Sequence, residues 1–148
     1  MQVQEFQVDD INSGSFSGSV RMAMTPHALV IDDEPLIRWA LSRALRDRGC
    51  DVVEAGDAAA VKATITESEL PFDVVLLDLK LPDSDDLGLL SYIRSLVPRA
   101  RIILMTAFGS DELKLGALAL GAARVLDKPF DVKTVAALAV DACDPDSP

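Results

Sequence analysis

Short apolar runs alternate with longer segments of helical periodicity between residues 27 and 143. Each run is β-branched or leucine-rich and is closed by polar residues, which is typical of a buried strand. Five such strands are predicted, at residues 27–31, 51–55, 73–77, 101–105 and 123–126. Because they are apolar along almost their whole length, they indicate a parallel sheet that is covered on both faces.

The segments between these strands have the pattern of amphipathic helices. The first carries one apolar stripe with arginines mostly on the other side, and Gly49 follows it where a C-terminal cap belongs. The stripe consists of Leu36, Ile37, Ala40, Leu41, Ala44 and Leu45. Further helices are predicted near residues 57–67, 86–97, 111–120 and 131–142. Strands and helices that alternate in this way predict an α/β fold with helices on both faces of the sheet.

The two ends of the chain lack this regular pattern. Residues 1–26 include a Ser- and Gly-rich stretch, and we predict a flexible N-terminal tail there. Within it, residues 3–8 (VQEFQV) leave an added edge strand as the alternative. We predict one domain at residues 27–143, followed by a short C-terminal tail at residues 144–148.

The composition is that of an acidic globular protein. Of 148 residues, 49% are hydrophobic and 26% are charged, which fits one ordinary domain with its own core. A formal net charge of −10 disfavours direct binding to nucleic acid, because phosphates would repel it. No apolar run is long enough to cross a membrane, and the N-terminal segment does not resemble a secretory signal. Cys50 and Cys143 lack a metal-type spacing, so a reducing, cytoplasmic location is expected.

Chemically capable side chains follow four of the five predicted strands. They are, in chain order, Asp32, Asp33, Glu34, Asp78, Thr106, Asp127 and Lys128. Since ligands of an open parallel sheet bind beyond the carboxyl ends of its strands, these side chains are expected to meet at one rim. Carboxylate oxygens suit Mg²⁺ and a lysine suits a phosphate oxygen, so the set indicates a Mg²⁺ and phosphoryl site.

Taken singly, most of these residues have a simpler explanation. Asp32 or Asp33 alone is explained equally well as a helix N-cap, and Thr106 alone as a structural hydroxyl. Capping does not explain Asp78, because a loop of about eight residues separates it from the next predicted helix. Lys128 stands before a helix, where a cation opposes the macrodipole, and this favours an anion as its partner. Taken together, the residues favour a shared site.

Four motifs make the chain resemble the receiver domain of bacterial two-component response regulators. An acidic pair lies in VIDDEP (30–35), and an acceptor aspartate lies in LLDLKLPDSDDLGLL (76–90). The threonine and lysine–proline signatures lie in ILMTAFG (103–109) and GAARVLDKPFD (121–131). The motifs follow one another with the family's order and spacing over residues 28–141. DLKLPDSD and MTAFGS are similar to receivers attached to regulators of nitrogen-type promoters.

This resemblance implies a doubly wound, flavodoxin-like sheet with strand order 2-1-3-4-5. It also implies that Asp78 accepts a phosphoryl group from a sensor histidine kinase or a histidine phosphotransfer protein, and that Thr106 then hydrogen-bonds the phosphoryl oxygen. Lys128 neutralises the phosphoryl oxygens, and Pro129 is expected to form a cis peptide that aims Lys128. The implied cofactor is Mg²⁺ or Mn²⁺. Its implied ligands are Asp33, Asp78, the main-chain carbonyl of Lys80 and, through water, Asp32.

Three features depart from the usual pattern of the family. Val125 stands three positions before the lysine, where an aromatic residue is common, so an aromatic switch is absent at that place. Asp86 takes a loop position that is often glycine. Lys80 and Phe108 stand two positions after the acceptor and the threonine, where a long cation and a ring would obstruct water. They predict a long-lived phosphoryl form, and an exposed pair without influence is the alternative.

We predict a phosphoacceptor signalling domain, not a metabolic enzyme, which assists its own phosphorylation and dephosphorylation. It acts either as a single-domain regulator or phosphorelay intermediate, or as a piece of a longer chain. A phosphorylation-independent interaction module on the same fold is the main competing function. A haloacid-type phosphohydrolase needs an aspartate where Lys80 stands, and a flavodoxin needs a phosphate loop where DDEP (32–35) stands, so both are disfavoured.

The helices predicted at 111–122 and 131–142 contain few charges. Leu115, Leu118, Ala137 and Val140 are more apolar residues than a single buried face needs. This favours a homodimer or partner surface across these two helices and the last strand. The alternative is that alanine and leucine are simply good helix formers.

Overall fold

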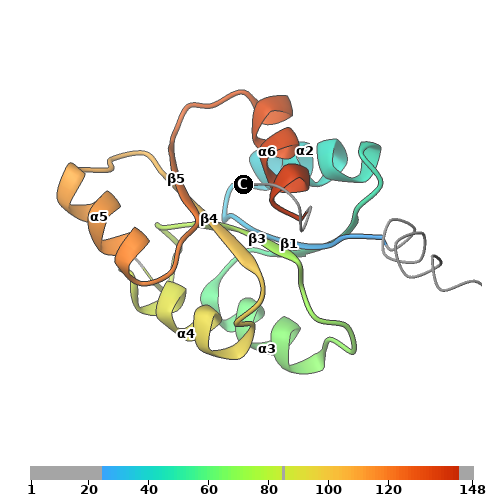
Figure 1. Ribbon diagram of the computed structural model, residues 1–148, viewed down its shortest axis with the longest axis horizontal. Helices are drawn as coiled ribbons and strands as arrows, with labels where there is room; N and C mark the ends of the chain where they lie inside the picture. The colour runs from blue at the N-terminus through green and yellow to red at the C-terminus, as the bar shows by residue number, and fades with distance from the viewer. Residues whose placement is uncertain (1–24, 85, 144–148) are drawn as a thin grey trace, which may run out of the picture.

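Five parallel strands form one sheet in the order β2-β1-β3-β4-β5 (Figure 1). The strands in this computed structural model are β1 (His27–Ile31), β2 (Asp51–Ala55), β3 (Val74–Asp78), β4 (Arg101–Thr106) and β5 (Arg124–Asp127). The helices between and after them are α2 (Pro35–Asp47), α3 (Ala58–Glu67), α4 (Gly88–Leu96), α5 (Asp111–Ala119) and α6 (Val132–Ala142). The α/β class and the implied strand order are therefore confirmed.

The structure describes residues 25–84 and 86–143. The tails predicted at residues 1–26 and 144–148, and the alternative strand at 3–8, lie outside the described residues except for Thr25 and Pro26. Among the described residues, no helix combines the length and the apolar character that crossing a membrane requires.

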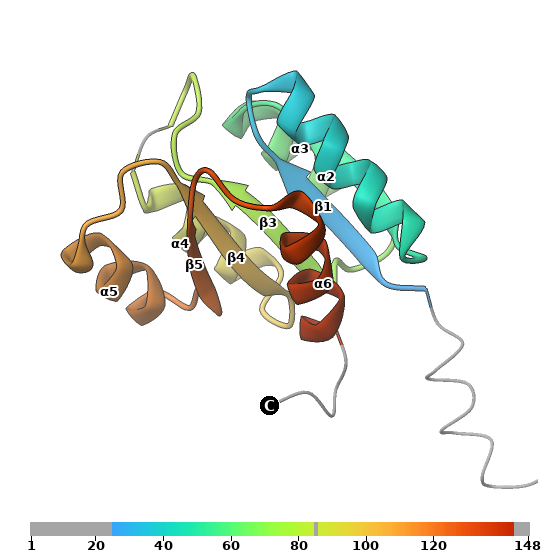
Figure 2. The same cartoon turned by 90° about the horizontal axis from the view of Figure 1, so that it is seen from above.

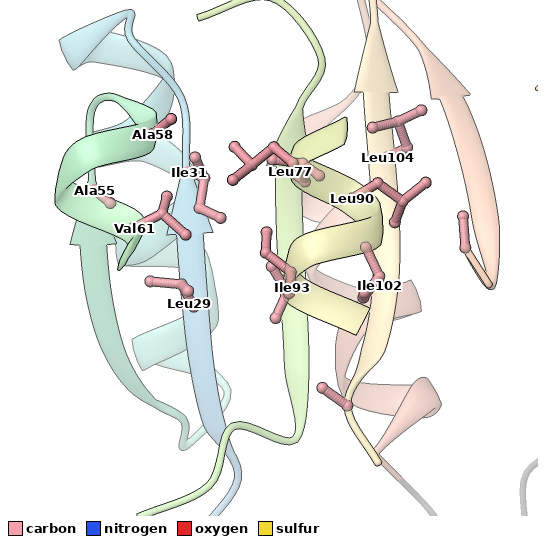
Figure 3. Close-up of a cluster of buried hydrophobic side chains, with 14 of the residues drawn as sticks. Leu29, Ile31, Ala55, Ala58, Val61, Leu77, Leu90, Ile93, Ile102 and Leu104 are labelled. Atoms are coloured by element: carbon pink, nitrogen blue, oxygen red, sulfur yellow. The ribbon is translucent and has the colours of Figure 1, made fainter. Parts of the chain in front are cut away.

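Helices cover both faces of the sheet (Figures 1 and 2). Helices α2 and α6 lie on one face, and α3, α4 and α5 lie on the other. Leu29 and Ile31 of β1 pack towards α3 and α4 (Figure 3). Ala28 and Val30 pack towards α2 and α6 on the other face. Because successive side chains of a strand point to opposite faces, a strand between two helix layers is apolar at every position. This explains the continuous apolar runs in the sequence.

Local sequence signals set the ends of several helices. Pro35 opens α2, where its missing N–H leaves no hydrogen bond unmade. Gly49 follows α2 with a φ of +92°, a conformation that favours glycine. The Ser110 hydroxyl accepts a hydrogen bond from the Leu113 amide (3.1 Å) and caps α5, as expected for this residue type.

The beginning of α3 depends on a distant loop as well as on its own cap. Asp57 accepts a hydrogen bond from the Ala60 amide (2.7 Å). The Asp83 carboxylate, in the loop between β3 and α4, accepts from the amides of Ala58 (2.7 Å) and Ala59 (3.1 Å). These amides would otherwise lack partners at the first turn of the helix. Asp83 thereby fixes the loop that follows Asp78 to the body of the domain.

Candidate functional site

The strand order reverses between β1 and β3, and this point holds the candidate site. The chain goes from β1 outwards to β2 and then returns across β1 to β3. Asp32 directly follows β1, and Asp78 is the last residue of β3. Neighbouring strands that diverge into loops on opposite sides leave a crevice at their carboxyl ends. The two carboxylates therefore stand at the mouth of this crevice.

Three carboxylates meet there. One oxygen each of Asp32, Asp33 and Asp78 lies within 4.8 Å of the others. Asp32 is fully buried and Asp78 is 5% exposed, whereas Asp33 lies at the surface. Hard, negatively charged oxygens at this spacing fit a divalent cation such as Mg²⁺ or Mn²⁺. The residues present therefore suit the metal that the family resemblance implies.

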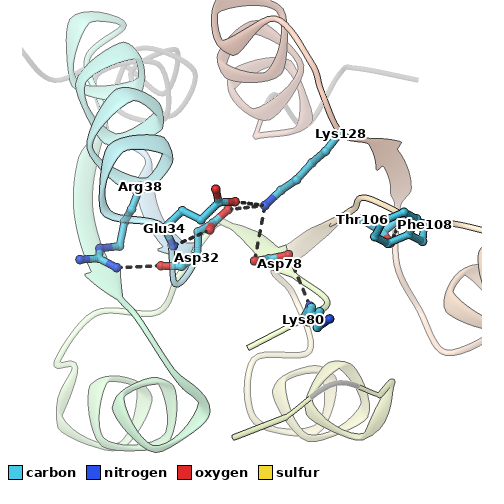
Figure 4. A network of polar contacts seen from close by, with 8 residues as sticks. All are labelled: Asp32, Glu34, Arg38, Asp78, Lys80, Thr106, Phe108 and Lys128. Atoms are coloured by element: carbon cyan, nitrogen blue, oxygen red, sulfur yellow. Dashed lines mark hydrogen bonds and ion pairs between the residues drawn. The ribbon is translucent and has the colours of Figure 1, made fainter. Parts of the chain in front are cut away.

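Lys128 reaches into the same cluster from the end of β5 (Figure 4). Its Nζ lies 3.0 Å from Asp32 Oδ2, 3.2 Å from Glu34 Oε1 and 3.5 Å from Asp78 Oδ2. The Lys128–Pro129 peptide bond is cis. A single cation thus faces three carboxylates, which leaves the site with an excess of negative charge.

Burial and this excess charge perturb the ionisation of Asp78. Burial, followed by the charge of Asp32, raises the pKa of Asp78 to about 6, against a smaller opposing effect of Lys128. Burial alone lowers the pKa of Lys128, but its hydrogen bond to Asp32 and the charges of Asp32 and Asp78 outweigh this and raise that pKa above its ordinary value. Lys128 is therefore firmly charged, whereas Asp78 carries a destabilised negative charge.

Thr106 ends β4 beside this cluster. It is buried, and its hydroxyl accepts a hydrogen bond from the Phe108 amide (3.2 Å). Its main-chain carbonyl accepts from the Lys128 amide (2.7 Å). The loop that begins at Thr106 is therefore tied directly to the residue that contacts Asp78.

A cavity of about 560 Å³ opens over Asp78. Lys80 and Phe108 line it on the sides of β3 and β4. The Lys80 amide lies 3.4 Å from Asp78 Oδ1, while the Phe108 side chain is 87% exposed. The cavity leaves room for a phosphoryl group above the carboxylate.

The other departures from the family pattern also have definite places. Val125 is half-buried and packs against the core cluster on the side of α3, α4 and α5. Asp86 accepts a hydrogen bond from the Gly88 amide (2.8 Å), which turns the chain into α4. It therefore acts within its own loop.

Two residues of the site were not assigned a role from the sequence. Glu34 gives Lys128 a third carboxylate, as described above. Arg38 donates from Nη1 to the main-chain carbonyl of Asp32 (2.8 Å). A charged residue one turn into the first helix is ordinarily solvated, so only the position of Arg38 six residues after Asp32 hints at this contact.

The strand order, together with the acidic cluster, Thr106 and Lys128 at the carboxyl ends of the strands, defines the receiver class of signalling domain. The family model of the response regulator receiver domain matches residues 28–139. The chain belongs to this family.

Curated relatives are regulators that contain such a domain. The probable transcriptional regulatory protein TcrX of Mycobacterium tuberculosis is 36% identical over 107 residues, which is 72% of this chain and 45% of the relative. The DNA-binding transcriptional regulator NtrC of Klebsiella pneumoniae is 36% identical over 113 residues, which is 75% of this chain and 23% of the relative. The chain thus spans less than half of the length of these relatives.

Solved structures give the same result. A CheY-like receiver domain protein from Methanospirillum hungatei JF-1 has a TM-score of 0.75 and 26% identity, over 82% of this chain and 95% of that one. A response regulator from Burkholderia pseudomallei, solved with a phosphorylated aspartic acid, a calcium ion and citrate, has a TM-score of 0.70 and 28% identity. The match covers 82% of this chain and 68% of that structure.

Proposed function

We propose that Asp78 accepts a phosphoryl group from a phosphohistidine on a sensor histidine kinase or a histidine phosphotransfer protein. The observation that carries this proposal is the position of Asp78, which is buried at the switch point between Asp32 and Lys128. A carboxyl group whose pKa rises to about 6 weakens the fold at neutral pH, and such costs concentrate at functional sites. The phosphorylated aspartic acid named for the Burkholderia relative supports the same chemistry.

The transfer itself needs no general base from this chain. One oxygen of Asp78 forms a bond to phosphorus, the bond from phosphorus to the donor imidazole nitrogen breaks, and its electron pair stays on that nitrogen. With a pKa of about 6, Asp78 is mostly ionised at pH 7. Lys128 Nζ, 3.5 Å from Asp78 Oδ2, lies within reach of the incoming phosphoryl oxygens and offsets their charge.

The metal-binding part of the proposal uses the residues of the acidic cluster. Asp33, Asp78 and the main-chain carbonyl of Lys80 would hold Mg²⁺ or Mn²⁺, and Asp32 would contribute through water. A cation held there would supply positive charge beside the transferred group. Asp32 is already held by Lys128 and by the Glu34 amide (2.9 Å), which suits a less direct role than that of the exposed Asp33.

Thr106 couples the phosphorylation of Asp78 to a change in the surface of the domain. Its hydroxyl, which accepts a hydrogen bond from the Phe108 amide, donates its own proton in a hydrogen bond to a phosphoryl oxygen, and the loop between β4 and α5 moves towards Asp78. Because Val125 offers no aromatic ring, the change passes through this loop to α5. The domain then acts by presenting a different surface to a partner, and it assists its own phosphorylation and dephosphorylation. Two free thiols, Cys50 and Cys143, support a cytoplasmic setting.

Intact-mass spectrometry tests the proposal. The chain is incubated with Mg²⁺ and a small phosphodonor such as acetyl phosphate, beside the variant Asp78→Asn. We expect one added phosphoryl group on the parent chain and none on the variant. If neither chain gains mass from the small donor or from a phosphohistidine donor, and the parent binds no Mg²⁺, the phosphorylation-independent interaction module becomes the better description.

A further inference from the structure

The Arg38 guanidinium contacts the loop after β1, as Figure 4 shows, and it also contacts the strand β2. Its Nη1 donates to the Asp32 carbonyl (2.8 Å), and its Nε donates to Glu54 Oε1 (3.2 Å). The side chain is three-quarters buried. Gly56 makes room for it, since a Cβ at that position would lie 3.0 Å from Arg38 Nη1. Such a fixed, forked contact is specific to arginine.

This contact completes the fixation of Asp32. The Asp32 amide donates to the Ala55 carbonyl (3.1 Å), and its carboxylate is held by Glu34 N (2.9 Å) and Lys128 Nζ (3.0 Å). The carbonyl that Arg38 holds belongs to the same planar peptide unit as the amide of Asp33. Holding that carbonyl therefore fixes the orientation of the Asp32–Asp33 peptide plane, and with it the direction in which the Asp33 side chain points.

We propose that Arg38 is a positioning residue of the metal site, which orients Asp33 by holding the Asp32–Asp33 peptide. The inference rests on the proposed function, because it assigns Asp33 as a direct ligand of the cation. Asp33 is exposed, so packing does not restrict it as it restricts Asp32 and Asp78. A ligand that is free to turn away loses entropy when it binds a metal, and a fixed peptide reduces that loss.

The positioning role of Arg38 can be distinguished from an effect of its charge, because the two change the metal affinity in opposite directions. A cation near the acidic cluster repels Mg²⁺, so an influence of Arg38 through charge alone predicts tighter metal binding when the charge is removed. Positioning predicts the opposite, namely weaker binding. Arg38→Lys separates the two further, because lysine keeps the charge but cannot make the forked contact.

Mn²⁺ binding, followed by electron paramagnetic resonance of the free ion, tests the proposal in the full chain. We expect Arg38→Gln and Arg38→Lys to weaken binding on the order of tenfold, as loss of a supporting contact around a ligand does. Gly56→Ala, which presses on the guanidinium, is expected to weaken binding by a smaller factor. Urea unfolding without metal is measured in parallel, so that a loss of folding is recognised.

Arg46→Gln is the matched control. Arg46 stands on the same helix, contacts the same Glu54 carboxylate (3.8 Å) and donates to a main-chain carbonyl, that of Val52 (3.3 Å), but it does not touch the acidic loop. The Arg46→Gln variant is expected to bind Mn²⁺ with the same affinity as the parent chain. Unchanged or tighter binding in the two Arg38 variants overturns the positioning role and leaves the metal site in place. If the parent binds Mn²⁺ no better than Asp33→Asn, the proposed metal site itself fails, and the role of Arg38 with it.

Discussion

At the scale of one residue, the surroundings of Asp78 suit its proposed role as phosphoacceptor but lower the stability of the fold. Its surroundings favour the neutral carboxyl group, since burial and the charge of Asp32 raise its pKa to about 6 from an ordinary value of 3.8. Between these two values the folded state binds more protons than the unfolded state. Stability therefore falls as the pH rises through this window, and the cost is fully present above pH 6.

Asp78→Asn is accordingly expected to stabilise the metal-free domain. At pH 7.5 the gain in the free energy of unfolding is about 3 kcal/mol, because the pKa rises by about two units and each unit corresponds to about 1.4 kcal/mol. The gain is expected to shrink as the pH is lowered from 6 to 4. Urea unfolding of both chains in EDTA across this range measures it. A gain that stays constant with pH would contradict the assigned pKa. In a second measurement, saturating Mg²⁺ is expected to reduce the gain, because it stabilises the folded parent chain.

Phe108 and Lys80 are expected to control how long the phosphoryl group survives. Both line the cavity over Asp78, where bulk beside the acyl phosphate hinders the approach of water. We expect Phe108→Ala to accelerate hydrolysis roughly fivefold, equivalent to about 1 kcal/mol of barrier. The decay of phosphorylated protein, followed by intact mass after removal of the donor, gives the rate. Equal decay of the parent and the variant would leave Phe108 as an exposed ring without influence.

At the scale of elements, the loop between β3 and α4 is held by an electrostatic contact with α3. The amides of Ala58 and Ala59 hold the pKa of Asp83 below its ordinary value, since both donate to the charged form. A carboxylate at a helix N-terminus also interacts favourably with the macrodipole. The loop that carries Lys80 is thereby anchored by a contact far from the site.

Because of this contact, Asp83 is expected to change the stability of the domain with pH in the direction opposite to that of Asp78. A lowered carboxyl pKa contributes stability above the unfolded value and loses it as the pH falls through the folded value. Asp83→Asn is therefore expected to destabilise the domain at pH 7, with a difference that closes below about pH 4. Asp86→Asn removes a charge from the same loop without touching α3 and serves as the control in urea unfolding. A difference for Asp83→Asn that persists unchanged at low pH would contradict the capping role.

At the scale of the whole molecule, Asp78 is almost inaccessible to another protein except through the rim of its cavity. A protein donor must therefore contact the elements around that rim. Helix α2 begins there and exposes two large apolar side chains on one face, Leu36 (81% exposed) and Trp39 (58% exposed). Exposed apolar residues beside a buried acceptor favour a partner surface.

Leu36→Glu and Trp39→Glu are expected to slow phosphotransfer from a phosphohistidine protein by about tenfold each, the loss of a contact worth about 1.4 kcal/mol. Phosphorylation by acetyl phosphate should stay unchanged, because a small donor needs no protein contact. Leu70→Glu is the matched control, since Leu70 is 61% exposed and lies between α3 and β3, at the other end of the sheet. Equal slowing in all three variants would count against a docking role of α2.

The second surface prediction concerns self-association through α5, β5 and α6. Leu115 and Leu118 are exposed on α5, as this proposal requires. Val140 instead packs partly buried against the cluster beneath α6, because that face of the helix covers the sheet. Leu115→Asp and Leu118→Asp are therefore the informative variants, and they are expected to abolish any dimer of the phosphorylated chain in sedimentation velocity. A dimer that survives both changes would place the interface elsewhere.

The sequence alone determined the features that depend on near neighbours. Continuous apolar runs predicted all five strands, and Gly49 marked the end of the first helix, because these signals act within one helical turn or along one strand. Motif spacing also named Asp32, Asp78 and Lys128 as candidates for one site. Parallel strands bring their ends together by geometry, so this grouping needed no knowledge of contacts.

Only the tertiary structure decided how the side chains of the site interact. Lys128 meets Asp32 across 96 positions of the chain, and which carboxylates it contacts depends on how β5 and α2 are placed around β1. The contact of Asp83 with α3 depends likewise on the path of a loop. Arg38 lies on a charged helix face, and the sequence does not distinguish an arginine in solvent from one that folds back on a main-chain carbonyl. Such contacts join separate elements, and pattern and propensity describe each element on its own.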